Sequence, residues 1–312
     1  MLRQSRPSHE IVVVNDGSTD GTPAVLERLA ANHSTLRIVH TPGRGVVGAL
    51  AAGLAQCRSP WIARMDADDE SLPRRLEVSA AALEADPTLA AVGTQVELFR
   101  EDRPISPNLA SYARWLNGLT SPEAVERDRF VESPLCQPSA LIRREALEAV
   151  GGWEEGPFPE DYQLWLKLLA RGYRLRAVEE VLHRWRDHEG RLTRTDERYA
   201  LEAHRRLKAR YLAQLPALAA RPCRVWGSGR QARSLARALR AHQVGLVGFI
   251  EVSLKKVGQR VDGLPVSDYR ALGPPDGHHL IAAVAAKGAR EEIRAFLRAR
   301  GHTEGRDFTC AA

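Results

Sequence analysis

The segment Glu10–Asn32, EIVVVNDGSTDGTPAVLERLAAN, reads as a strand, a turn and a helix in succession. Its first part, EIVVVND, is a β-branched run without polar alternation, which is typical of a parallel strand buried on both faces. The turn GSTDGT is rich in Gly, Ser and Asp, and the residues after it have helical spacing. A strand followed by a helix is the repeating unit of an α/β domain, so this stretch predicts a parallel sheet.

The same alternation continues along the first two thirds of the chain. It predicts strands in LRIVHT (36–41), PWIARMD (60–66) and LAAVGTQVELF (89–99), and helices in GRGVVGALAAGLAQC (43–57) and RRLEVSAAALEAD (74–86). Further on, ALIRREALEAVGGW (140–153) predicts a strand and a short helix, and EDYQLWLKLLARGY (160–173) an amphipathic helix. Residues 100–130 have no clear pattern.

A second α/β pattern begins at Cys223, after a charged helix at 196–215 and the linker-like PALAARP at 216–222. It contains a strand, a glycine turn and a helix, then further strands and a closing helix. We therefore predict a domain at 1–215, a linker at 216–222 and a Rossmann-like domain at 223–312. The expected fold class is α/β, with a mostly parallel sheet and flanking helices in the first domain.

The composition narrows the classes of partner. The chain has 312 residues and a formal charge of +6, which suits phosphate-bearing small molecules, nucleic acid or an anionic membrane surface. No basic block is interleaved with aromatic residues, so we do not expect nucleic acid as a partner. The four cysteines are far apart and form no CxxC pair, which argues against a zinc site or a disulfide framework. We expect a cytoplasmic protein without a signal peptide or transmembrane segment, with peripheral contact at the inner face of the membrane an open alternative.

An acidic cluster follows the strand predicted at 60–66. In RMDADDESLP (Arg64–Pro73), the carboxylates of Asp66, Asp68 and Asp69 repel one another unless a positive group lies among them. They stand where open α/β sheets bind ligands, and a divalent cation with oxygen ligands is the simplest partner. The alternative is an acidic turn that caps the next helix.

Two further acidic sites occur in similar settings. Asn15 and Asp16 end the first strand, where Asp16 can accept hydrogen bonds from a nucleobase or ribose and the Ser18 backbone can approach closely; an ordinary Asp-Gly turn is the alternative. Glu160 and Asp161 begin a helix, where a carboxylate can serve as a general base or simply stabilise the helix start.

Taken in order, these stretches resemble the family 2 glycosyltransferases of the GT-A fold. VVNDGSTDGT matches the family's nucleotide-binding strand end, RMDADD its DxD element, and PEDYQLWLKLLARGY its ED base motif. SPLCQPSALIRREALEAVGGW and WRDHEGRLTRTD also follow the family. The resemblance covers about residues 5–200.

The resemblance implies a role for each matching residue. Asp16 would contact the base of a nucleotide-diphospho-sugar, Asp66 would lie near the ribose, and Asp68 would bind Mg²⁺ or Mn²⁺ at the diphosphate. Asp161 would deprotonate the acceptor hydroxyl. The remaining donor-binding candidates are Asn15, Ser18, Arg44, His188 and Arg191, with Arg184 and Arg186 beside them; a solvated basic stretch is the alternative for the residues after 183.

The chain also departs from the family. Relatives begin with a further apolar strand, of VSVIIPVYN type, and a helix, whereas MLRQSRPSHE resembles only the tail of that helix. We therefore expect an N-terminally truncated domain with unpaired strand edges. Ala51 replaces an asparagine that many relatives have, and Gln137 replaces a histidine.

In the second domain, GSGRQA matches G-x-G-x-x-A, and Glu251 follows at the end of the next strand. Gly227, Gly229 and Glu251 are therefore candidates for a nucleotide site, and a module for packing, assembly or partner docking is the alternative.

The leading hypothesis is a metal-dependent, inverting glycosyltransferase of hexosyltransferase type, acting on a saccharide or lipid-linked acceptor in polysaccharide or glycan assembly. One alternative is a defective homologue that serves as a binding scaffold. The other is an NAD(P)-dependent sugar oxidoreductase built on GSGRQA.

Overall fold

The computed structural model describes residues 1–312, which form two compact units. The first contains residues 1–126 and 134–195, and the second contains residues 127–133 and 196–312. The segment 196–215 thus groups with the second unit, although the sequence assigned it to the first domain. Within the predicted linker, Pro216–Ala220 forms helix α10, because proline at the first helical position and alanines favour a helix. The predicted domain boundary stays a prediction.

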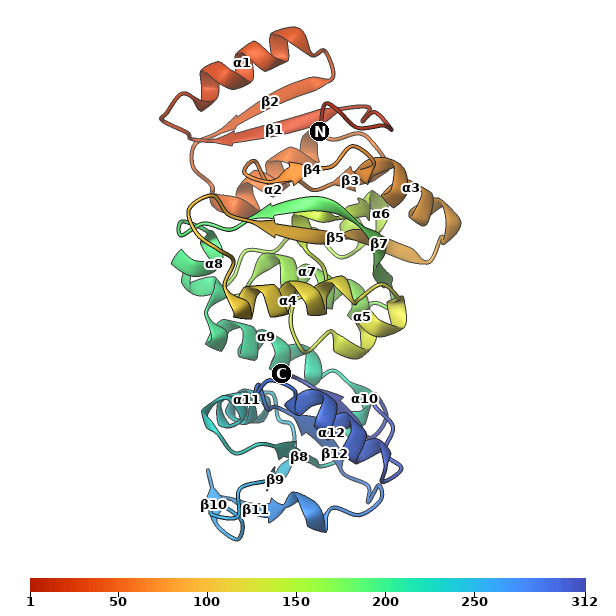
Figure 1. Ribbon diagram of the computed structural model, residues 1–312, viewed down its shortest axis with the longest axis vertical. Coiled ribbons are helices and arrows are strands. Elements are labelled where there is room, and N and C mark those ends of the chain that lie inside the picture. Colours follow the sequence, from red (N-terminus) through yellow and green to blue (C-terminus); the bar gives the residue numbers. More distant parts are fainter. The chain divides into compact units, whose positions relative to one another are not determined.

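The first unit contains two separate sheets (Figure 1). In one, β1 (Ile11–Asp16) and β2 (Leu36–Thr41) pair in parallel. The other has the order β3-β6-β5-β7-β4. Its strands are β3 (Trp61–Ala63), β4 (Glu70–Ser71), β5 (Leu89–Phe99), β6 (Leu141–Arg143) and β7 (Arg174–Arg186). β6 runs antiparallel to β3 and β5, and β4 runs antiparallel to β7, whereas β5 and β7 are parallel.

Helices flank these sheets. They are α1 (Thr22–Asn32), α2 (Gly45–Gln56), α3 (Arg75–Ala85), α4 (Pro107–Asn117), α6 (Arg144–Ala149), α7 (Glu160–Ala170) and α8 (Leu192–Thr195), with the 3₁₀ turn η1 (Gln137–Ser139). Helix α5 (Pro122–Asp128) begins in the first unit and ends in the second. Residues 1–10, expected to resemble a helix tail, form turns and no helix.

The core of the first unit lies between β5 and α7. The first four residues of β5 are at most 1% exposed, and Trp165 of α7 is fully buried. The indole Nε1 of Trp165 donates to the carbonyl of Leu135 at 3.1 Å, so the one polar atom of this ring is satisfied. By contrast, β1 has a single buried residue, Asn15, and α1 has none. The β1–β2 sheet is therefore the less buried part of this unit.

The second unit has one sheet with the order β10-β11-β9-β8-β12-β13. Its strands are β8 (Cys223–Trp226), β9 (Leu246–Glu251), β10 (Arg260–Val261), β11 (Leu264–Asp268), β12 (His279–Ala282) and β13 (Phe308–Cys310). All pairs are parallel except β10 with β11. The helices are η2 (Glu197–Tyr199), α9 (Leu201–Leu212), α10, α11 (Arg230–Ala241), η3 (Tyr269–Ala271) and α12 (Ala289–Arg298). The chain passes from β8 to β9 on one side and later to β12 on the other, which is the strand-order reversal of Rossmann-like domains.

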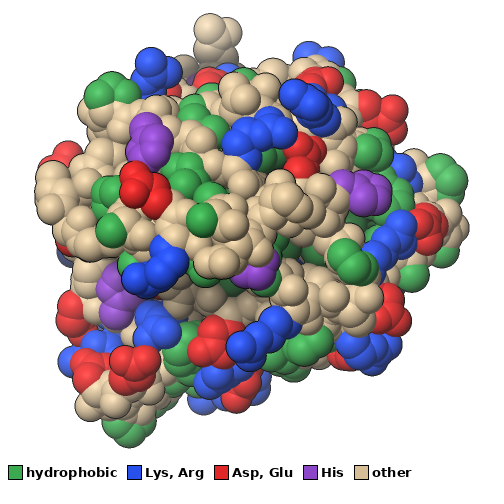
Figure 2. All heavy atoms as spheres, turned by 90° about the horizontal axis from the view of Figure 1, so that it is seen from above, with side chains coloured by type: hydrophobic (Ala, Val, Ile, Leu, Met, Phe, Trp, Pro, Cys, Tyr) green, Lys and Arg blue, Asp and Glu red, His purple; other side chains and the backbone are tan.

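None of the helices has the length and apolar character needed to cross a membrane. The face drawn in Figure 2 carries basic and acidic side chains interspersed with one another. All four cysteines are free thiols.

Candidate functional site

The acidic loop, Asp66–Glu70, follows β3 and leads into β4. Its first carboxylate, that of Asp66, forms an ion pair with Arg64 at 2.5 Å, and its last, that of Glu70, pairs with Arg184 of β7 at 2.5 Å. Arginines on both sides thus offset part of the repulsion within the loop.

Asp69 fixes the acidic loop to β7. Its side chain is 1% exposed, and its Oδ2 lies 2.8 Å from Nε2 of His183, which is fully buried. Its Oδ1 accepts a hydrogen bond from the backbone N–H of Arg186 at 2.8 Å. A buried carboxylate with partners on both oxygens has little left to offer a ligand, so Asp69 is a structural residue.

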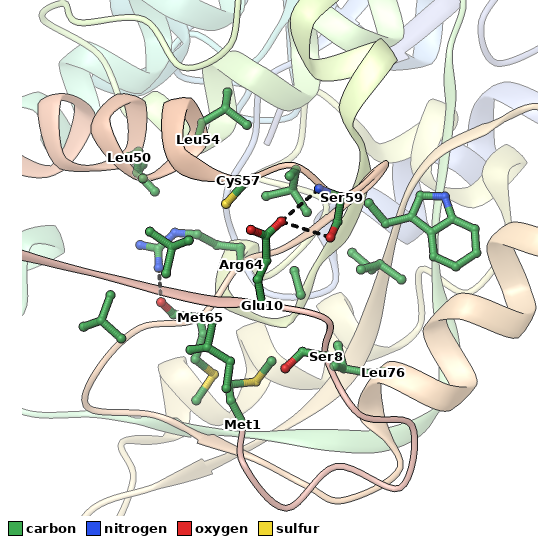
Figure 3. Close-up of a pocket in the computed structure, with 18 of the residues that line it drawn as sticks. Met1, Ser8, Glu10, Leu50, Leu54, Cys57, Ser59, Arg64, Met65 and Leu76 are labelled. Atoms are coloured by element: carbon green, nitrogen blue, oxygen red, sulfur yellow. Dashed lines mark hydrogen bonds between the residues drawn. The ribbon is translucent and has the colours of Figure 1, made fainter. Parts of the chain in front are cut away.

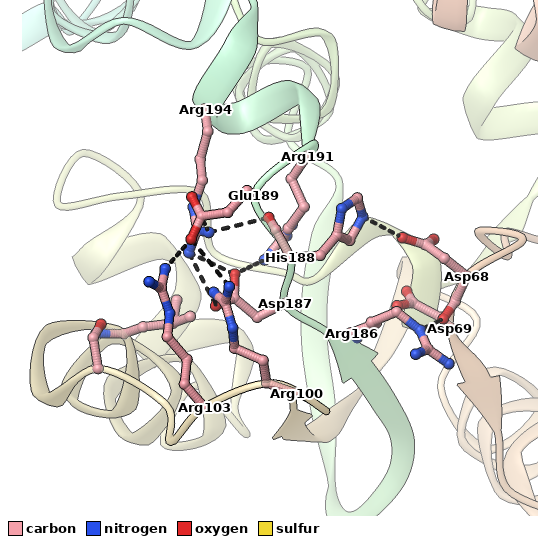
Figure 4. Close-up of polar contacts among 12 residues, drawn as sticks. Asp68, Asp69, Arg100, Arg103, Arg186, Asp187, His188, Glu189, Arg191 and Arg194 are labelled. Carbon is pink, nitrogen blue, oxygen red and sulfur yellow. Dashed lines mark hydrogen bonds and ion pairs between the residues drawn. The ribbon is translucent and has the colours of Figure 1, made fainter.

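Asp68 points away from this anchor. Its side chain is 45% exposed, and its Oδ2 lies 3.0 Å from Nε2 of His188 (Figure 4). The Asp68 carbonyl accepts from Nε of Arg186 at 2.7 Å. The anchoring of Asp69 therefore presents Asp68 to solvent opposite a basic segment.

That basic segment, Arg186–Arg194, is held by a buried carboxylate of its own. Asp187 is 3% exposed and accepts hydrogen bonds from Arg194 at 2.7 and 2.9 Å and from Arg100 at 2.9 Å (Figure 4). Burial by itself would raise the pKa of Asp187, but the bonds from Arg100 and Arg194 hold that pKa below its ordinary value. The guanidinium of Arg191 stacks 4.4 Å from the ring centroid of Trp185. These contacts fix the turn that carries His188.

Charges in the acidic loop and in the basic segment both affect the pKa of one buried thiol. Burial raises the pKa of Cys136 well above its ordinary value, and the carboxylates of Asp69 and Asp66 raise that pKa further, while Arg191 opposes them. The Cys136 thiol is therefore protonated and unreactive.

Asp16 organises the turn between β2 and α2. Its Oδ1 accepts from the Thr41 hydroxyl at 2.5 Å and from the Arg44 backbone N–H at 2.7 Å, and its Oδ2 accepts from the Gly45 N–H at 2.8 Å. The hydrogen bond from Thr41, followed by that from the Arg44 N–H, lowers the pKa of Asp16 below its ordinary value. Asp16 is thus ionised and sits at the N-terminus of α2, where the helix dipole favours a negative charge.

Asn15 and Ser18, the other candidates in the turn after β1, have contacts of their own beside Asp16. Asn15 is buried. Its Nδ2 lies 3.3 Å from Nδ1 of His40, and its Oδ1 accepts a hydrogen bond from the Ser18 backbone N–H at 3.1 Å. Gly17 has φ +78°, and a Cβ there would lie 3.1 Å from the Gly43 nitrogen. Only glycine fits this close approach without strain. The loop after β1 therefore packs directly against the loop after β2.

Asp161 lies half-buried in the first turn of α7, after Pro159. The neighbouring Glu160 is 5% exposed. Acidic residues are common in the first turn of a helix, where the dipole attracts negative charge. The role of Asp161 as a base stays a prediction.

Residues 1–151 match the model of glycosyl transferase family 2. This part of the chain belongs to glycosyl transferase family 2. An uncharacterized glycosyltransferase of Haemophilus influenzae is 31% identical over 186 residues, covering 58% of this chain and 66% of the relative. The putative glycosyltransferase EpsE of Bacillus subtilis is 29% identical over 210 residues, covering 65% of this chain and 71% of EpsE. The matches thus span about two thirds of the length of these two relatives.

The solved structure of S. aureus TarS 1-349 is similar to this family 2 chain in fold. The TM-score is 0.50 at 16% sequence identity, and the match covers 77% of this chain and 64% of the TarS structure. The predicted GT-A-type α/β fold is confirmed.

The acidic loop of this family 2 chain suits a cation that takes few protein ligands. No group of three or more His, Cys, Asp or Glu side chains is placed to hold a metal ion. Mg²⁺ typically takes one or two carboxylates, several waters and phosphate oxygens. A single exposed carboxylate such as Asp68, with a phosphate-bearing ligand, fits that pattern, whereas an all-protein metal cage does not.

The candidates in the second unit are held by their own loop. Gly227 has φ +102° and follows β8, and Gly229 precedes α11. Glu251 accepts from the Ser228 hydroxyl at 2.5 Å and its N–H at 3.2 Å, and from the N–H groups of Val252 at 2.9 Å and Ser253 at 3.3 Å. Both oxygens of Glu251 thus stabilise the turns after β8 and β9. A nucleotide site here stays a prediction.

Sequence reasoning missed the residues that hold the family 2 motifs in place. His183, Asp187 and Arg75 are buried and carry the anchoring contacts, and Arg75 donates to the carbonyls of Arg64 at 3.0 Å and Pro138 at 2.5 Å. A polar residue inside an otherwise apolar segment could have indicated them, for example His183 after Val181 and Leu182.

Proposed function

We propose that this chain transfers a sugar from a nucleotide-diphospho-sugar to a hydroxyl acceptor with the help of Mg²⁺ or Mn²⁺. The observation that carries the proposal is the contact between Asp68 and His188 at 3.0 Å. It puts an exposed carboxylate opposite an exposed imidazole, on a segment that also carries Arg191. A diphosphate with a bound cation needs both kinds of group, since the carboxylate holds the cation and the basic side chains hold the phosphate oxygens.

The proposed donor site extends from this contact to the turn around Asp16. Asp16, with Asn15 and the Ser18 backbone, would receive the base, and Asp66 would lie at the ribose. The side chain of Arg44, at the N-terminus of α2, adds positive charge for the phosphates. These assignments follow from membership of family 2 and from the contacts that fix each loop.

In the proposed reaction, Asp161 accepts the proton of the acceptor hydroxyl, and the acceptor oxygen then bonds to the anomeric carbon as the bond to the nucleoside diphosphate breaks. Attack from the face opposite the leaving group inverts the configuration. The cation, when bound, neutralises negative charge that develops on the leaving phosphate. His188 and Arg191 donate hydrogen bonds to the same oxygens. A saccharide or lipid-linked acceptor in polysaccharide or glycan assembly is the proposed acceptor class, at the cytoplasmic face.

The first test is calorimetric binding of UDP and GDP, with and without Mn²⁺, to the 312-residue chain. We expect Mn²⁺-dependent binding that Asp68→Asn weakens, because the amide keeps the shape of the side chain and removes its charge. Asp86→Asn, at the end of α3, is the matched control and should bind as the parent does. Equal binding by parent and Asp68→Asn would contradict the proposal.

A binding scaffold without catalysis is the second candidate function. It is favoured by the lack of pairing between β1 and β3, which divides the proposed donor site between two sheets. Release of nucleoside diphosphate from a donor, abolished by Asp161→Asn while nucleotide binding persists, would separate the enzyme from the scaffold.

A further inference from the structure

The two units expose apolar side chains in different ways. In the first unit, Leu50 and Leu54 line a cavity of about 670 Å³, which is drawn in Figure 3. In the second unit, Val252 and Leu254 follow β9 in a turn, and 58% and 66% of their surfaces are exposed. A cavity admits a ligand that fits inside it, whereas exposed side chains on a turn can meet a flat surface.

Helix α11 carries a row of arginines beside this turn. The buried side of the helix is formed by small and apolar residues, namely Ala232, Ser234, Leu235, Ala236 and Leu239. Four arginines follow one another at intervals of three or four positions and therefore share one side of the helix: Arg230, Arg233, Arg237 and Arg240. The side chains of Arg233 and Arg237 are 43% and 58% exposed. The outer side of α11 is thus a row of cations.

The segment 252–263, which follows β9, is fixed to α11 at two places. The first is at the start of the helix, where Glu251 meets the turn that enters α11. Its Oε2 accepts a hydrogen bond from the Ser228 hydroxyl at 2.5 Å and lies 3.5 Å from Nζ of Lys256. The turn that carries Leu254 is therefore held near the beginning of the arginine row.

The second attachment is Asp262, in the turn between β10 and β11. Its carboxylate accepts hydrogen bonds from Arg233 at 2.6 and 3.2 Å and lies 3.5 Å from Arg237. Its carbonyl accepts a hydrogen bond from Arg240 at 3.0 Å. The segment therefore runs along the arginine row, and the two form one continuous surface.

Cations outnumber carboxylates on this surface. The segment adds three cations to the four arginines of α11, namely Lys255, Lys256 and Arg260. The carboxylates that pair with these seven cations are those of Asp262 and Glu251. We call the seven cations, together with the side chains of Val252 and Leu254, the basic face. It keeps an excess of positive charge after its ion pairs are formed.

We propose that the basic face docks on a membrane surface that contains anionic phospholipids. The cations bind headgroup phosphates, and Val252 and Leu254 enter the boundary between the headgroups and the acyl chains. A cluster of four to eight Lys and Arg residues on an amphipathic helix is typical of contact with anionic lipid. The exposed side chains between these cations are aliphatic, which favours lipid over nucleic acid, since single-stranded nucleic acid stacks on aromatic residues. The basic face lies outside residues 1–151, so it does not follow from membership of family 2.

The test measures binding of the 312-residue chain to lipid vesicles by co-sedimentation. One set of vesicles contains phosphatidylcholine with about one quarter phosphatidylglycerol, and the other contains phosphatidylcholine alone. We expect binding to the anionic vesicles and not to the neutral ones. We also expect release in about 1 M salt, where the Debye length falls to about 3 Å. The measurement needs neither nucleotide nor metal, so its result is independent of the proposed sugar transfer.

Two arginine variants locate the charged contact. Arg237 lies 3.5 Å from Asp262, and Arg298 of α12, which is 57% exposed, lies 3.3 Å from Glu304, so the two arginines have similar settings. Helices α11 and α12 cross in opposite directions along the sheet, and crossovers of the same hand then place them on opposite faces. Arg237→Gln should lower the vesicle partition coefficient roughly fivefold, whereas Arg298→Gln should leave it nearly unchanged.

A third variant tests the apolar contact. Leu254→Ser removes the side chain that enters the bilayer and should lower the partition coefficient roughly fivefold or more. Val25→Ser, on α1 of the first unit, is the control, because Val25 is 43% exposed and lies outside the basic face. It should bind as the parent does. Circular dichroism of each variant checks that it is folded.

Three results would overturn the proposal. The first is absence of binding to anionic vesicles by the folded parent chain. The second is equal weakening by Arg237→Gln and Arg298→Gln, since the attraction would then come from the charge of the whole chain. The third is tighter binding to a single-stranded oligonucleotide than to anionic vesicles, with no effect of Leu254→Ser on either, because the basic face would then be a nucleic-acid surface.

Discussion

The Oδ2 of Asp69 lies 2.8 Å from Nε2 of His183, and both side chains are withdrawn from solvent. One residue earlier, Asp68 is 45% exposed. Adjacent aspartates thus divide two tasks, because they lie in a turn, closed by the hydrogen bond from the Asp69 N–H to the Asp66 carbonyl at 3.3 Å, that directs the two side chains to different partners. Asp69 holds the loop to β7, and that contact fixes where Asp68 can meet a ligand.

This division predicts opposite effects for two substitutions. Asp69→Ala removes one member of a buried pair and should lower the free energy of unfolding by about 3 kcal/mol. Asp68→Ala removes an exposed side chain and should change it by less than about 0.5 kcal/mol while abolishing Mn²⁺-dependent nucleotide binding. Urea unfolding and calorimetry measure the two effects. Equal stability losses would show that Asp68 also supports the fold.

The buried contacts of Arg75 predict that even a conservative substitution lowers the free energy of unfolding. Burial lowers its pKa to about 10, and the guanidinium holds the carbonyls of Arg64 and Pro138 together. Arg75→Lys cannot reach both carbonyls in the same geometry, so we expect a loss of about 2 kcal/mol in unfolding free energy. Arg74→Lys, whose parent side chain forms an exposed ion pair with Glu180, is the matched control and should change stability by less than about 1 kcal/mol. A thermal unfolding series in which Arg74→Lys loses more stability than Arg75→Lys would contradict this prediction.

The turn after β1 predicts a strict requirement for glycine at one position. Gly17→Ala must accept φ +78° and a contact of 3.1 Å with the Gly43 nitrogen, so we expect a loss of about 1–2 kcal/mol and weaker nucleotide binding. Gly21→Ala is the control, since its φ is −71° and a Cβ there meets nothing within 4 Å. It should leave both properties nearly unchanged. Similar stability of the two variants would disprove the close approach.

His279 in the second unit predicts a pH dependence of stability. Burial, with a smaller effect of Arg221, lowers its pKa to about 4 from an ordinary 6.5, so the unfolded chain binds a proton that the folded chain does not. Stability is complete above pH 6.5 and falls as pH decreases toward 4, by about 3 kcal/mol for this group. His279→Gln should flatten that dependence between pH 4 and 6.5, whereas His242→Gln, on an exposed residue, should not. Unfolding curves at several pH values test it.

The sequence predicted segments in which composition and neighbours favour the same structure. β5 matches the apolar run at 89–99, and α7 matches an amphipathic helix with acids at its start. β7 was missed because charged residues such as Glu179 and Glu180 interrupt its apolar alternation. The three acidic candidates were visible because each follows or begins an apolar element. The different fates of Asp68 and Asp69 were not, since His183 lies 114 residues away and pairing over that distance leaves no local pattern.

The separation of β1 from β3 places Asp16 and Asp68 on two sheets that share no backbone ladder. A ligand that needs both residues binds only those molecules in which the two sheets stand at the correct spacing. Its apparent dissociation constant is then the intrinsic one divided by the fraction of such molecules. If a tenth of the population has that spacing, the measured affinity is about tenfold weaker than the contacts allow. Any interaction that holds β1 and β3 at a fixed distance therefore changes the apparent dissociation constant for the nucleotide, although it does not contact the nucleotide.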